Sequence, residues 1–427
     1  MRILGIETSC DETAAAVVEY GQKILSNVVV SQIDIFAEYG GVIPEVAARS
    51  HLEAMMPVID KALADAGCGW GDIDTIAVTH APGLLGSLLI GTLTARTLAI
   101  LHNKPLYAVH HLKSHVYANW LIDGEPESVF SSAGLENPGT SYAGRPGEPS
   151  PSETNLSASS GIYVPGFSNH FMLQKRQAQA LPTFPLLALV VSGGHTQILY
   201  MRGHNQFEII GTTRDDAVGE CFDKVAKILG LPYPGGPSIA KAAEGGDAEK
   251  YRLPHPKIPG LDFSFSGLKT AVLRAAQKEV GVPISYPSHK LADLLSEQQV
   301  ADFAASFQKT AVDILLEKLQ MALKMHPEVR SVVFAGGVSA NKALRKAAKL
   351  WAGGRALGSP MERRRDMRED ARTGPAQDSR SVFFPAPELS GDNGAMVATA
   401  AYYEIQAGAE PTDPYKLNIY PRVSIEK

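Results

Sequence analysis

Short apolar runs separated by polar turns fill the first part of the chain. Residues 3–6, 14–18 and 24–30 are largely apolar, and the polar stretch 7–13 separates the first two runs. Runs of this length bounded by polar residues are typical of β-strands, so we expect three strands in a meander. A helix is expected to begin at Pro44, which suits a first helical turn, and to bend at Pro57. Its buried face is expected to carry Leu52, Met55, Ile59, Leu63 and Ala66.

Predicted strands and helices then alternate. We expect a strand at 76–78, a turn at Pro82-Gly83, a helix at 85–101, a strand at 106–109 and a helix that begins within 110–115. The resulting order is βββαβαβα. The same order returns later, with strands at 186–191, 197–200 and 207–210, helices at 216–229 and 297–325, a strand at 331–334, a helix at 340–351, a strand at 382–384 and a helix at 394–406. One further helical segment is inserted at 238–296.

Two copies of βββαβαβα predict a duplicated α/β fold, because an internal repeat reflects a repeated structural unit. A chain of 427 residues is also long enough for two cores. The organisation resembles that of the actin, Hsp70 and sugar-kinase superfamily, in which two lobes close over a cleft. We expect lobe I at residues 1–123, lobe II at 185–393, and a C-terminal helix at about 394–427 that packs back on lobe I.

Two polar stretches interrupt the pattern. Residues 124–184 are rich in Ser, Gly, Pro and Asn and carry few apolar residues, so they are predicted to form a flexible insertion; a functional loop is the alternative. Residues 353–380 contain Arg363, Arg364 and Arg365 among acidic residues. This second stretch is predicted to be a solvated loop inside lobe II, and a nucleic-acid-binding arm is the alternative.

Composition narrows the class of protein and its compartment. Hydrophobic residues make up 44% of the chain, charged residues 20%, and the formal net charge is -5. This balance is ordinary for a globular protein and gives no overall basic footprint for nucleic acid. Cys10, Cys68 and Cys221 are isolated, which argues against a disulfide framework or a thiolate zinc site. We find no signal peptide and no apolar run that could span a bilayer, so we expect a cytoplasmic protein.

The stretch HHLKSH at 110–115 holds three histidines. If a helix begins here, His111 and His115 lie one turn apart on one face, a spacing that suits two ligands of a metal ion. A third ligand must come from elsewhere, and Asp392 in SGDNG at 390–394 is the candidate. Asp392 can instead be the N-cap of the last helix, a position that favours Asp.

The predicted turns carry the other candidates. The turn Ser192-Gly193-Gly194-His195-Thr196 and the pair Gly336-Gly337 let backbone N–H groups approach a phosphate closely. Asp11 and Glu12 lie in the first turn, where a carboxylate can act as a general base or simply be solvated. Asp223 lies in a predicted helix and can receive a ribose hydroxyl, or else pair with Lys227.

These stretches closely resemble the bacterial form of the tRNA N6-threonylcarbamoyladenosine transferase family, once labelled glycoproteases. The matches are GIETSCDET at 5–13, GVIPEVAARSH at 41–51, PGLLGSL at 82–88, HHLKSH at 110–115, VSGGHT at 191–196, FDK at 222–224, YPGGP at 233–237, DFSFSGLKT at 262–270, GGVSAN at 336–341 and DNG at 392–394. They cover most of both lobes. The insertions at 124–184 and 353–380 depart from the compact family pattern.

The resemblance implies an acyltransferase that moves the threonylcarbamoyl group of threonylcarbamoyl-AMP to N6 of adenosine 37 in tRNAs reading ANN codons. It implies that His111, His115 and Asp392 hold one divalent metal, Fe²⁺ or else Zn²⁺, and that Asp11 and Glu12 take part in catalysis. The residues implied to bind the acyl-adenylate are Val191, Ser192, Gly193, Gly194, His195, Asp223, Gly236 and Asn341. A shorter paralogous subunit and a P-loop ATPase are the implied partners, and no role follows for His110 or Lys113.

Three other functions compete with this one. A metalloprotease is disfavoured because no Glu lies between His111 and His115, whereas zincins carry one as general base. A small-molecule kinase of the same superfamily would phosphorylate a sugar or carboxylate with ATP and would not need a metal ion bound by the histidines. An inactive scaffold is disfavoured because it does not need the candidate catalytic and metal-binding residues that the chain contains: Asp11, His111, His115 and Asp392.

Overall fold

Two five-stranded sheets with the same topology form the centre of the molecule. The computed structural model describes residues 1–122, 181–256, 258–352 and 380–426. Lobe I contains β1 (Arg2–Glu7), β2 (Glu12–Glu19), β3 (Lys23–Ser31), β4 (Thr75–Ala81) and β5 (Leu106–His110), in the order β3-β2-β1-β4-β5. Lobe II contains β6 (Leu186–Val191), β7 (Thr196–Met201), β8 (Phe207–Thr212), β9 (Ser331–Ala335) and β10 (Ser381–Phe383), in the order β10-β9-β6-β7-β8.

The pairing within the two sheets is the same as well. The first three strands of each lobe are antiparallel, and the fourth and fifth join in parallel. The helices that connect the parallel strands give each lobe the βββαβαβα order that its hydrophobic pattern predicts. The predicted duplicated α/β fold of the actin, Hsp70 and sugar-kinase type is therefore confirmed.

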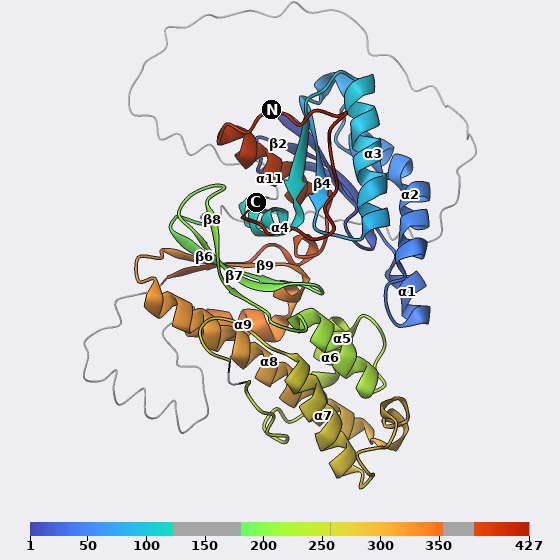
Figure 1. Ribbon diagram of the computed structural model, residues 1–427, viewed down its shortest axis with the longest axis vertical. Coiled ribbons are helices and arrows are strands. Elements are labelled where there is room, and N and C mark those ends of the chain that lie inside the picture. Colours follow the sequence, from blue (N-terminus) through green and yellow to red (C-terminus); the bar gives the residue numbers. More distant parts are fainter. Residues whose placement is uncertain (123–180, 257, 353–379, 427) are drawn as a thin grey trace, which may run out of the picture.

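Helices cover both sheets in five layers (Figure 1). α1 (Ile33–Tyr39), α2 (Pro44–Asp65) and α3 (Leu85–Leu101) lie outside lobe I, while α5 (Val218–Ile228), α6 (Gly235–Ala243), α7 (Ser266–Glu279), α8 (Glu297–Met325) and α9 (Lys342–Ala352) lie outside lobe II. α4 (His111–Tyr117) and α11 (Gly394–Gln406) lie between the sheets. The central layer therefore belongs to both lobes.

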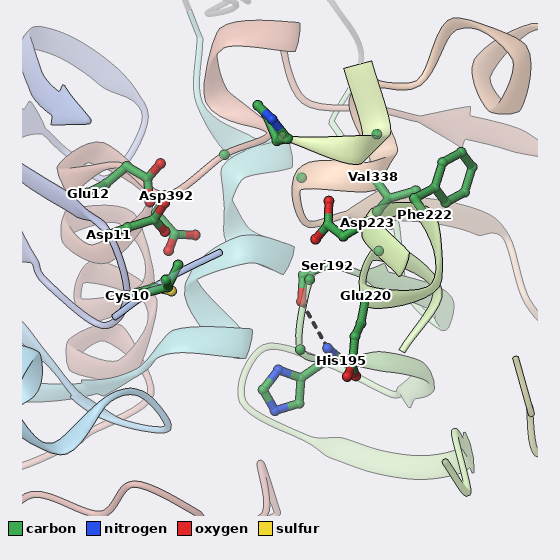
Figure 2. Close-up of a pocket in the computed structure, with 18 of the residues that line it drawn as sticks. Cys10, Asp11, Glu12, Ser192, His195, Glu220, Phe222, Asp223, Val338 and Asp392 are labelled. Atoms are coloured by element: carbon green, nitrogen blue, oxygen red, sulfur yellow. Dashed lines mark hydrogen bonds between the residues drawn. The ribbon is translucent and has the colours of Figure 1, made fainter. Parts of the chain in front are cut away.

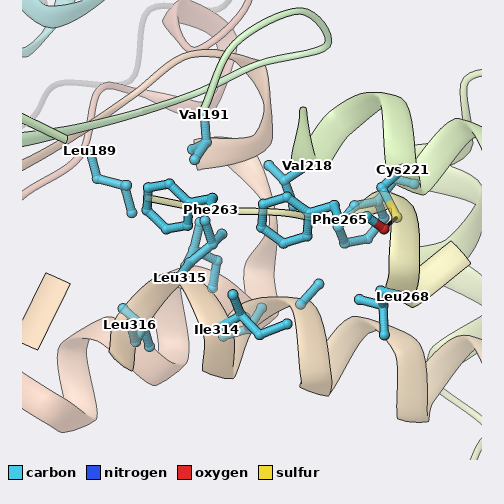
Figure 3. Close-up of a cluster of buried hydrophobic side chains, with 14 of the residues drawn as sticks. Leu189, Val191, Val218, Cys221, Phe263, Phe265, Leu268, Ile314, Leu315 and Leu316 are labelled. Atoms are coloured by element: carbon cyan, nitrogen blue, oxygen red, sulfur yellow. Dashed lines mark hydrogen bonds between the residues drawn. The ribbon is translucent and has the colours of Figure 1, made fainter. Parts of the chain in front are cut away.

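Strand alternation explains how one sheet serves two cores. In β6, the side chains of Leu187, Leu189 and Val191 face the outer helices, and those of the alternate residues face α4 and α11: Leu186, Ala188 and Val190. Both sets are apolar because both faces are covered, which is why these strands are continuous apolar runs. The segment between α6 and α7 reaches the outer core too, since Phe263 and Phe265 lie between lobe II strands and α8 (Figure 3).

The structure corrects several predicted elements. α1 follows β3 directly and was not predicted. α2 continues through Pro57, and Leu52 is 67% exposed, although Met55, Ile59 and Leu63 are buried as expected. The additional segment at 238–296 contributes the end of α6 and all of α7. The last helix spans Gly394–Gln406, as predicted from the hydrophobic pattern, so it does not continue to about residue 427 as the predicted C-terminal helix of lobe I does.

The two predicted insertions lie outside the described residues, except at their C-terminal ends. Residues 181–184 pack against lobe II and the central layer: Thr183 N donates to Ser331 Oγ over 2.9 Å, and Phe184 stacks on Trp120. Arg380 donates to the carbonyl of Val329. Across the described ranges, no helix has an apolar stretch long enough to cross a membrane.

Candidate active site and metal centre

A cleft of about 1540 Å³ separates the two lobes. One wall comes from the turn after β1 and from the loop before α11, and it carries Asp11, Glu12 and Asp392 (Figure 2). The opposite wall carries Ser192, His195 and Asp223 of lobe II (Figure 2). Eleven of the thirteen predicted site residues line this cleft: Asp11, Glu12, His111, Ser192, Gly193, Gly194, His195, Asp223, Gly236, Asn341 and Asp392. His115 and Val191 do not line it.

Local geometry explains why two distant segments meet at the first wall. α4 begins directly after β5, so His111 and His115 lie one turn apart, with their ring centroids separated by 4.5 Å. Asp392 comes directly before α11, which rests on β1 and β2. At Gly394 a Cβ would lie 2.6 Å from Ala16 N, and at Gly5 a Cβ would lie 2.7 Å from Ala398 N. Glycine at both positions lets the helix sit against the sheet and brings Asp392 beside α4.

The three predicted metal ligands form one cluster. Asp392 Oδ1 lies 3.1 Å from His115 Nε2 and 3.6 Å from His111 Nε2, and one ligand atom of each residue lies within 4.8 Å of the others. The alternative role for Asp392 is wrong, because the N-cap of α11 is Asn393, whose Oδ1 accepts from Met396 N over 2.9 Å. The Asp392 carboxylate is therefore free to face the two imidazoles.

The cluster fits a transition-metal ion. Among the described residues, the buried His115 makes no hydrogen bond through either ring nitrogen, and its Nε2 faces only the Asp392 carboxylate at 3.1 Å, an unfavourable state unless another ligand completes it. Two imidazoles and one carboxylate suit Zn²⁺ or Fe²⁺, whereas Mg²⁺ and Ca²⁺ prefer oxygen ligands only. Three protein ligands also leave a coordination position for a substrate.

Glu7 is a functional candidate that sequence reasoning missed. Its carboxylate is fully buried and lies 3.1 Å from His111 Nδ1, and it accepts from Thr79 Oγ1 over 2.6 Å and from Ser9 N. Ser9 Oγ also lies 3.1 Å from His111 Nδ1. A carboxylate on the outer nitrogen of a ligating histidine fixes the tautomer and directs the other nitrogen to the metal. The only signal in the sequence is a charged residue at the end of an apolar strand.

Charges around the cluster favour a cation. Burial alone would lower the pKa of His111, but Asp392 and Glu7 raise it to about 9. Burial alone would raise the pKa of Asp392, but His111 and His115 lower it to about 2. The pKa of His195, across the cleft, falls to about 4 because of burial and the nearby His111 and His115. His195 is therefore neutral at pH 7, and the negative potential is concentrated on the lobe I wall.

Asp11 and Glu12 form a second acidic pair on this wall. Burial, and then the carboxylates of Asp11 and Asp392, raise the pKa of Glu12 well above its usual range. Ser31 Oγ donates to Glu12 Oε1 over 3.3 Å. Glu12 therefore retains a proton more readily than an isolated carboxyl.

On lobe II, the turn after β6 is open towards the cleft. Ser192 N donates to His195 O over 2.8 Å, and His195 N donates to Ser192 Oγ over 3.1 Å. A Cβ at Gly193 or Gly194 would meet no atom within 4 Å. Val191 is fully buried at the end of β6, so only its backbone borders this turn.

The remaining predicted residues have structural contacts as well as a place in the cleft. Asp223 Oδ1 accepts from Gly235 N over 2.7 Å at the start of α6, so the predicted alternative of a pair with Lys227 is not what the structure contains. Asn341 Oδ1 accepts from Ala343 N and Leu344 N at the start of α9. Gly236 lies beside Asp223 in the cleft, and a Cβ there would be unobstructed.

The fold and the site together define a two-lobed α/β protein. A cluster of candidate metal ligands on one lobe faces a glycine-containing turn on the other. The family model for tRNA N6-adenosine threonylcarbamoyltransferase matches residues 23–138 and 167–399. Proteins of that name from Symbiobacterium thermophilum and Thermomicrobium roseum are each 41% identical to this chain, over 95% and 96% of it and over 92% and 93% of their own lengths. The chain belongs to the tRNA N6-adenosine threonylcarbamoyltransferase family, which confirms the predicted resemblance and the transferase class.

Other comparisons add detail. The relative from Caldicellulosiruptor bescii is 37% identical over 100% of this chain and 98% of its own length, so the length of this chain is shared with that relative. The family model leaves residues 139–166 unmatched, inside the predicted insertion. Among solved structures, the activator of 2-hydroxyisocaproyl-CoA dehydratase from Clostridium difficile is 12% identical, with a TM-score of 0.42, over 97% of this chain and all of that one.

Proposed function

We propose that this chain transfers the threonylcarbamoyl group of threonylcarbamoyl-AMP to N6 of adenosine 37 in tRNAs that read ANN codons. The observation that carries the proposal is the cleft itself, which sets Asp11 and the His111, His115, Asp392 cluster opposite the open turn 192–195. Family membership supplies the reaction class. In the reaction, N6 forms a bond to the carbamoyl carbon, the bond from that carbon to the phosphate oxygen breaks, and AMP leaves with the electron pair.

The carboxylates on the lobe I wall are suited to accept the proton that adenine N6 loses in the reaction. An adenine N6 amine must lose a proton as it forms the new bond, and a positioned carboxylate accelerates such a step. Asp11 lines the cleft on this wall and is the acceptor that we assign. Asp11 then receives the N6 proton, and Glu12 keeps its own and holds Asp11 in position.

The same wall is suited to hold one divalent metal. His111, His115 and Asp392 are its proposed ligands, and Glu7 orients His111. The donor set is compatible with Fe²⁺, which the family resemblance favours, and with Zn²⁺. When bound, such an ion acts as a Lewis acid that polarises a carbonyl or phosphoryl oxygen.

The lobe II wall is suited to hold the adenylate. The N–H groups of residues 192–195 border the cleft where Gly193 and Gly194 leave room for a phosphate. Asp223 and Asn341 flank this turn and are proposed to contact the nucleoside. Because the acyl-adenylate hydrolyses readily, closure of the two lobes over it would also exclude water.

We propose a shorter paralogous subunit and a P-loop ATPase as partners. An exposed row of apolar residues on the outer helices of lobe I supports the first of these: Leu52 and Met56 on α2, and Leu85, Leu89 and Leu93 on the neighbouring α3. Side chains spaced by four residues form one face of α3, and a helical face of this kind suits packing against helices of a similar lobe. The cytoplasm is the proposed compartment, where the tRNA substrate is found.

Depletion of this chain in its own cells tests the function with partners present. Nucleosides from tRNAs reading ANN codons are separated and identified by mass spectrometry, with tRNAs reading other codons as the internal control. We expect threonylcarbamoyladenosine to disappear on depletion and to return with the wild-type chain but not with Asp11→Ala. Persistence of the modified nucleoside after depletion would contradict the proposal. A kinase or protease would leave it unchanged.

A further inference from the structure

The segment after α11 is an extended strap that runs from one lobe to the other. Residues 409–426 contain no long helix or strand, yet hydrogen bonds fix them along their length. Thr412 N donates to Leu106 O over 2.7 Å, and Ala108 N donates to Thr412 Oγ1 over 3.3 Å, so the strap covers the outer edge of β5. Leu417 is buried in the lobe I core.

Two histidines outside the metal cluster hold the middle of the strap. His80 lies on β4, its Nδ1 is 3.2 Å from Asn418 O, and its backbone carbonyl accepts from Tyr420 N over 3.0 Å. His110 Nδ1 accepts from Leu112 N, and its Nε2 lies 3.3 Å from Val423 O. One neutral tautomer of His110 satisfies both contacts. His110, which has no place in the metal cluster, thus fastens the strap beside it.

The end of the strap reaches lobe II and closes one side of the cleft. Ile425 is buried in the central core, and Glu426 Oε1 accepts from Ile209 N of β8 over 2.8 Å. Gly83 N donates to Pro421 O over 3.3 Å, beside the turn that carries Ser9. Residues 421–424 consequently line the same cleft as His111 and Asp392.

The strap brings a positive charge to a negative side of the cleft. Lys241, Lys342 and Arg422 are the lysines and arginines among the described residues that line it, and the two lysines belong to lobe II. Arg422 is exposed, and within the described part of the chain its guanidinium takes part in no hydrogen bond or ion pair. Its backbone is fixed on both sides by the contacts of Pro421 and Val423.

We propose that Arg422 binds a backbone phosphate of the tRNA next to the adenosine that is modified. This inference rests on the proposed function. A phosphodiester approaching the lobe I wall meets the carboxylates of Asp11 and Asp392, which repel it, and a planar guanidinium offers a bidentate contact that offsets the repulsion. The adenylate phosphate is a less suitable ligand for Arg422, because the open glycine turn lies on the other lobe.

Binding of a tRNA transcript at several salt concentrations tests the proposal. Loss of one phosphate contact to a single-stranded loop makes the plot of log K against log salt concentration less steep, by about 0.7 in slope. Between 1 M and 0.1 M salt, this difference in slope amounts to about fivefold in binding affinity. We expect this change for Arg422→Gln and a larger loss for Arg422→Glu. Arg422→Lys should keep the wild-type salt slope, because the charge is retained, but bind less tightly, because an ammonium group cannot make the bidentate contact. Lys416→Gln is the matched control, because Lys416 lies on the same strap, pairs with Asp413 and is outside the cleft.

AMP binding and turnover separate the possible outcomes. We expect AMP affinity to be unchanged in Arg422→Gln. KM for tRNA should rise, and kcat should change by a smaller factor than KM. An unchanged salt slope in Arg422→Gln overturns the proposal. An unchanged slope together with weaker AMP binding assigns the contact to the adenylate and likewise overturns it. If the wild-type chain binds tRNA with the expected slope but forms no threonylcarbamoyladenosine, the proposed function fails and the phosphate contact is retained.

Discussion

The two lobes share one strand order but place opposite chemistry at the same point. In each, the turn between the first two strands faces the cleft. The lobe I turn is buried and fixed: Thr8 Oγ1 donates to Ser87 O, His51 Nε2 lies 2.9 Å from Cys10 O, and Asp11 O accepts from Gln32 N. The lobe II turn contains Gly193 and Gly194 and is open. The duplicated fold thus determines where a site lies, and the residues of each turn determine what it can bind.

The two turns therefore differ in the groups that they present: charged side chains in fixed positions on lobe I, and backbone N–H groups on lobe II. Lobe I presents carboxylates and imidazoles whose positions are set by buried hydrogen bonds, as catalytic groups and metal ligands require. Lobe II presents N–H groups in a turn with no side chain in the way, as a phosphate requires. Substitutions in lobe I are therefore expected to affect chemistry and metal, and those in lobe II to affect adenylate affinity.

The largest expected effect is on the chemical step. Asp11→Asn keeps the size of the side chain but removes its ability to accept a proton, so we expect the single-turnover rate of tRNA modification to fall by about 10²- to 10⁴-fold. AMP affinity should stay within about twofold of wild type, since the contact surface of lobe II is unchanged. Asp60→Asn on the exposed side of α2 is the control. Equal losses of rate and AMP affinity would show that the lobes are not separable in this way.

Removal of a metal ligand is next in size. His115→Ala leaves two ligands, and we expect metal affinity to fall by more than about 100-fold, a larger loss than changes outside the ligand set cause. Metal content of the purified variant is measured by mass spectrometry, against His289→Ala, an exposed histidine far from the cleft. Full metal occupancy in His115→Ala would exclude the proposed ligand set. The native metal is read from the wild-type sample in the same measurement.

Glu7→Gln tests the support behind the ligands. It removes the charge that faces His111 Nδ1 and is expected to weaken metal binding by about 10- to 100-fold. Affinity is measured by competition with a chelator, and the unfolding midpoint is measured without metal. The control is Glu19→Gln in the same sheet, which pairs with Arg2 at the surface. A lower midpoint with unchanged metal affinity would give Glu7 a purely structural role.

The smallest effect is expected on lobe II. Gly194→Ala adds a methyl group that meets no protein atom within 4 Å, so the free protein should keep its stability. We expect AMP affinity to fall roughly tenfold, because the methyl group enters the space proposed for the phosphate. Gly267→Ala in α7, also unobstructed and outside the cleft, is the control. Wild-type AMP affinity in Gly194→Ala would move the phosphate away from this turn.

Much of this fold was predictable because buried strands leave a strong local pattern. The runs at 3–6, 14–18 and 186–191 are apolar on both faces, which marks them as central strands whatever covers them. α1 was missed because seven residues with one fully buried side chain, Phe36, leave little periodicity. Leu52 was misassigned because its spacing fits the buried face of α2, although nothing in the described structure covers it.

The candidate site was predictable only where the spacing is local. His111 and His115 follow from one helical turn, and Asp392 needed both the duplicated fold and the family resemblance to be placed near them. Glu7 and the strap could not be found in this way, because the contacts of Glu7 come from Thr79 and His111 and those of the strap from His80 and His110. Such contacts depend on how the sheets and the central layer pack, which no local pattern records.

The position of α11 affects the order in which the protein can be completed during synthesis. This helix lies against β1 and β2, which emerge from the ribosome long before the helix does. Until then the inner face of the first sheet lacks its cover, and Asp392 is absent from the cluster. Pairing of such distant segments is slow and leaves apolar surface open in the meantime. A nascent or C-terminally shortened chain therefore lacks a finished lobe I, part of the central layer that both lobes share, and a working centre.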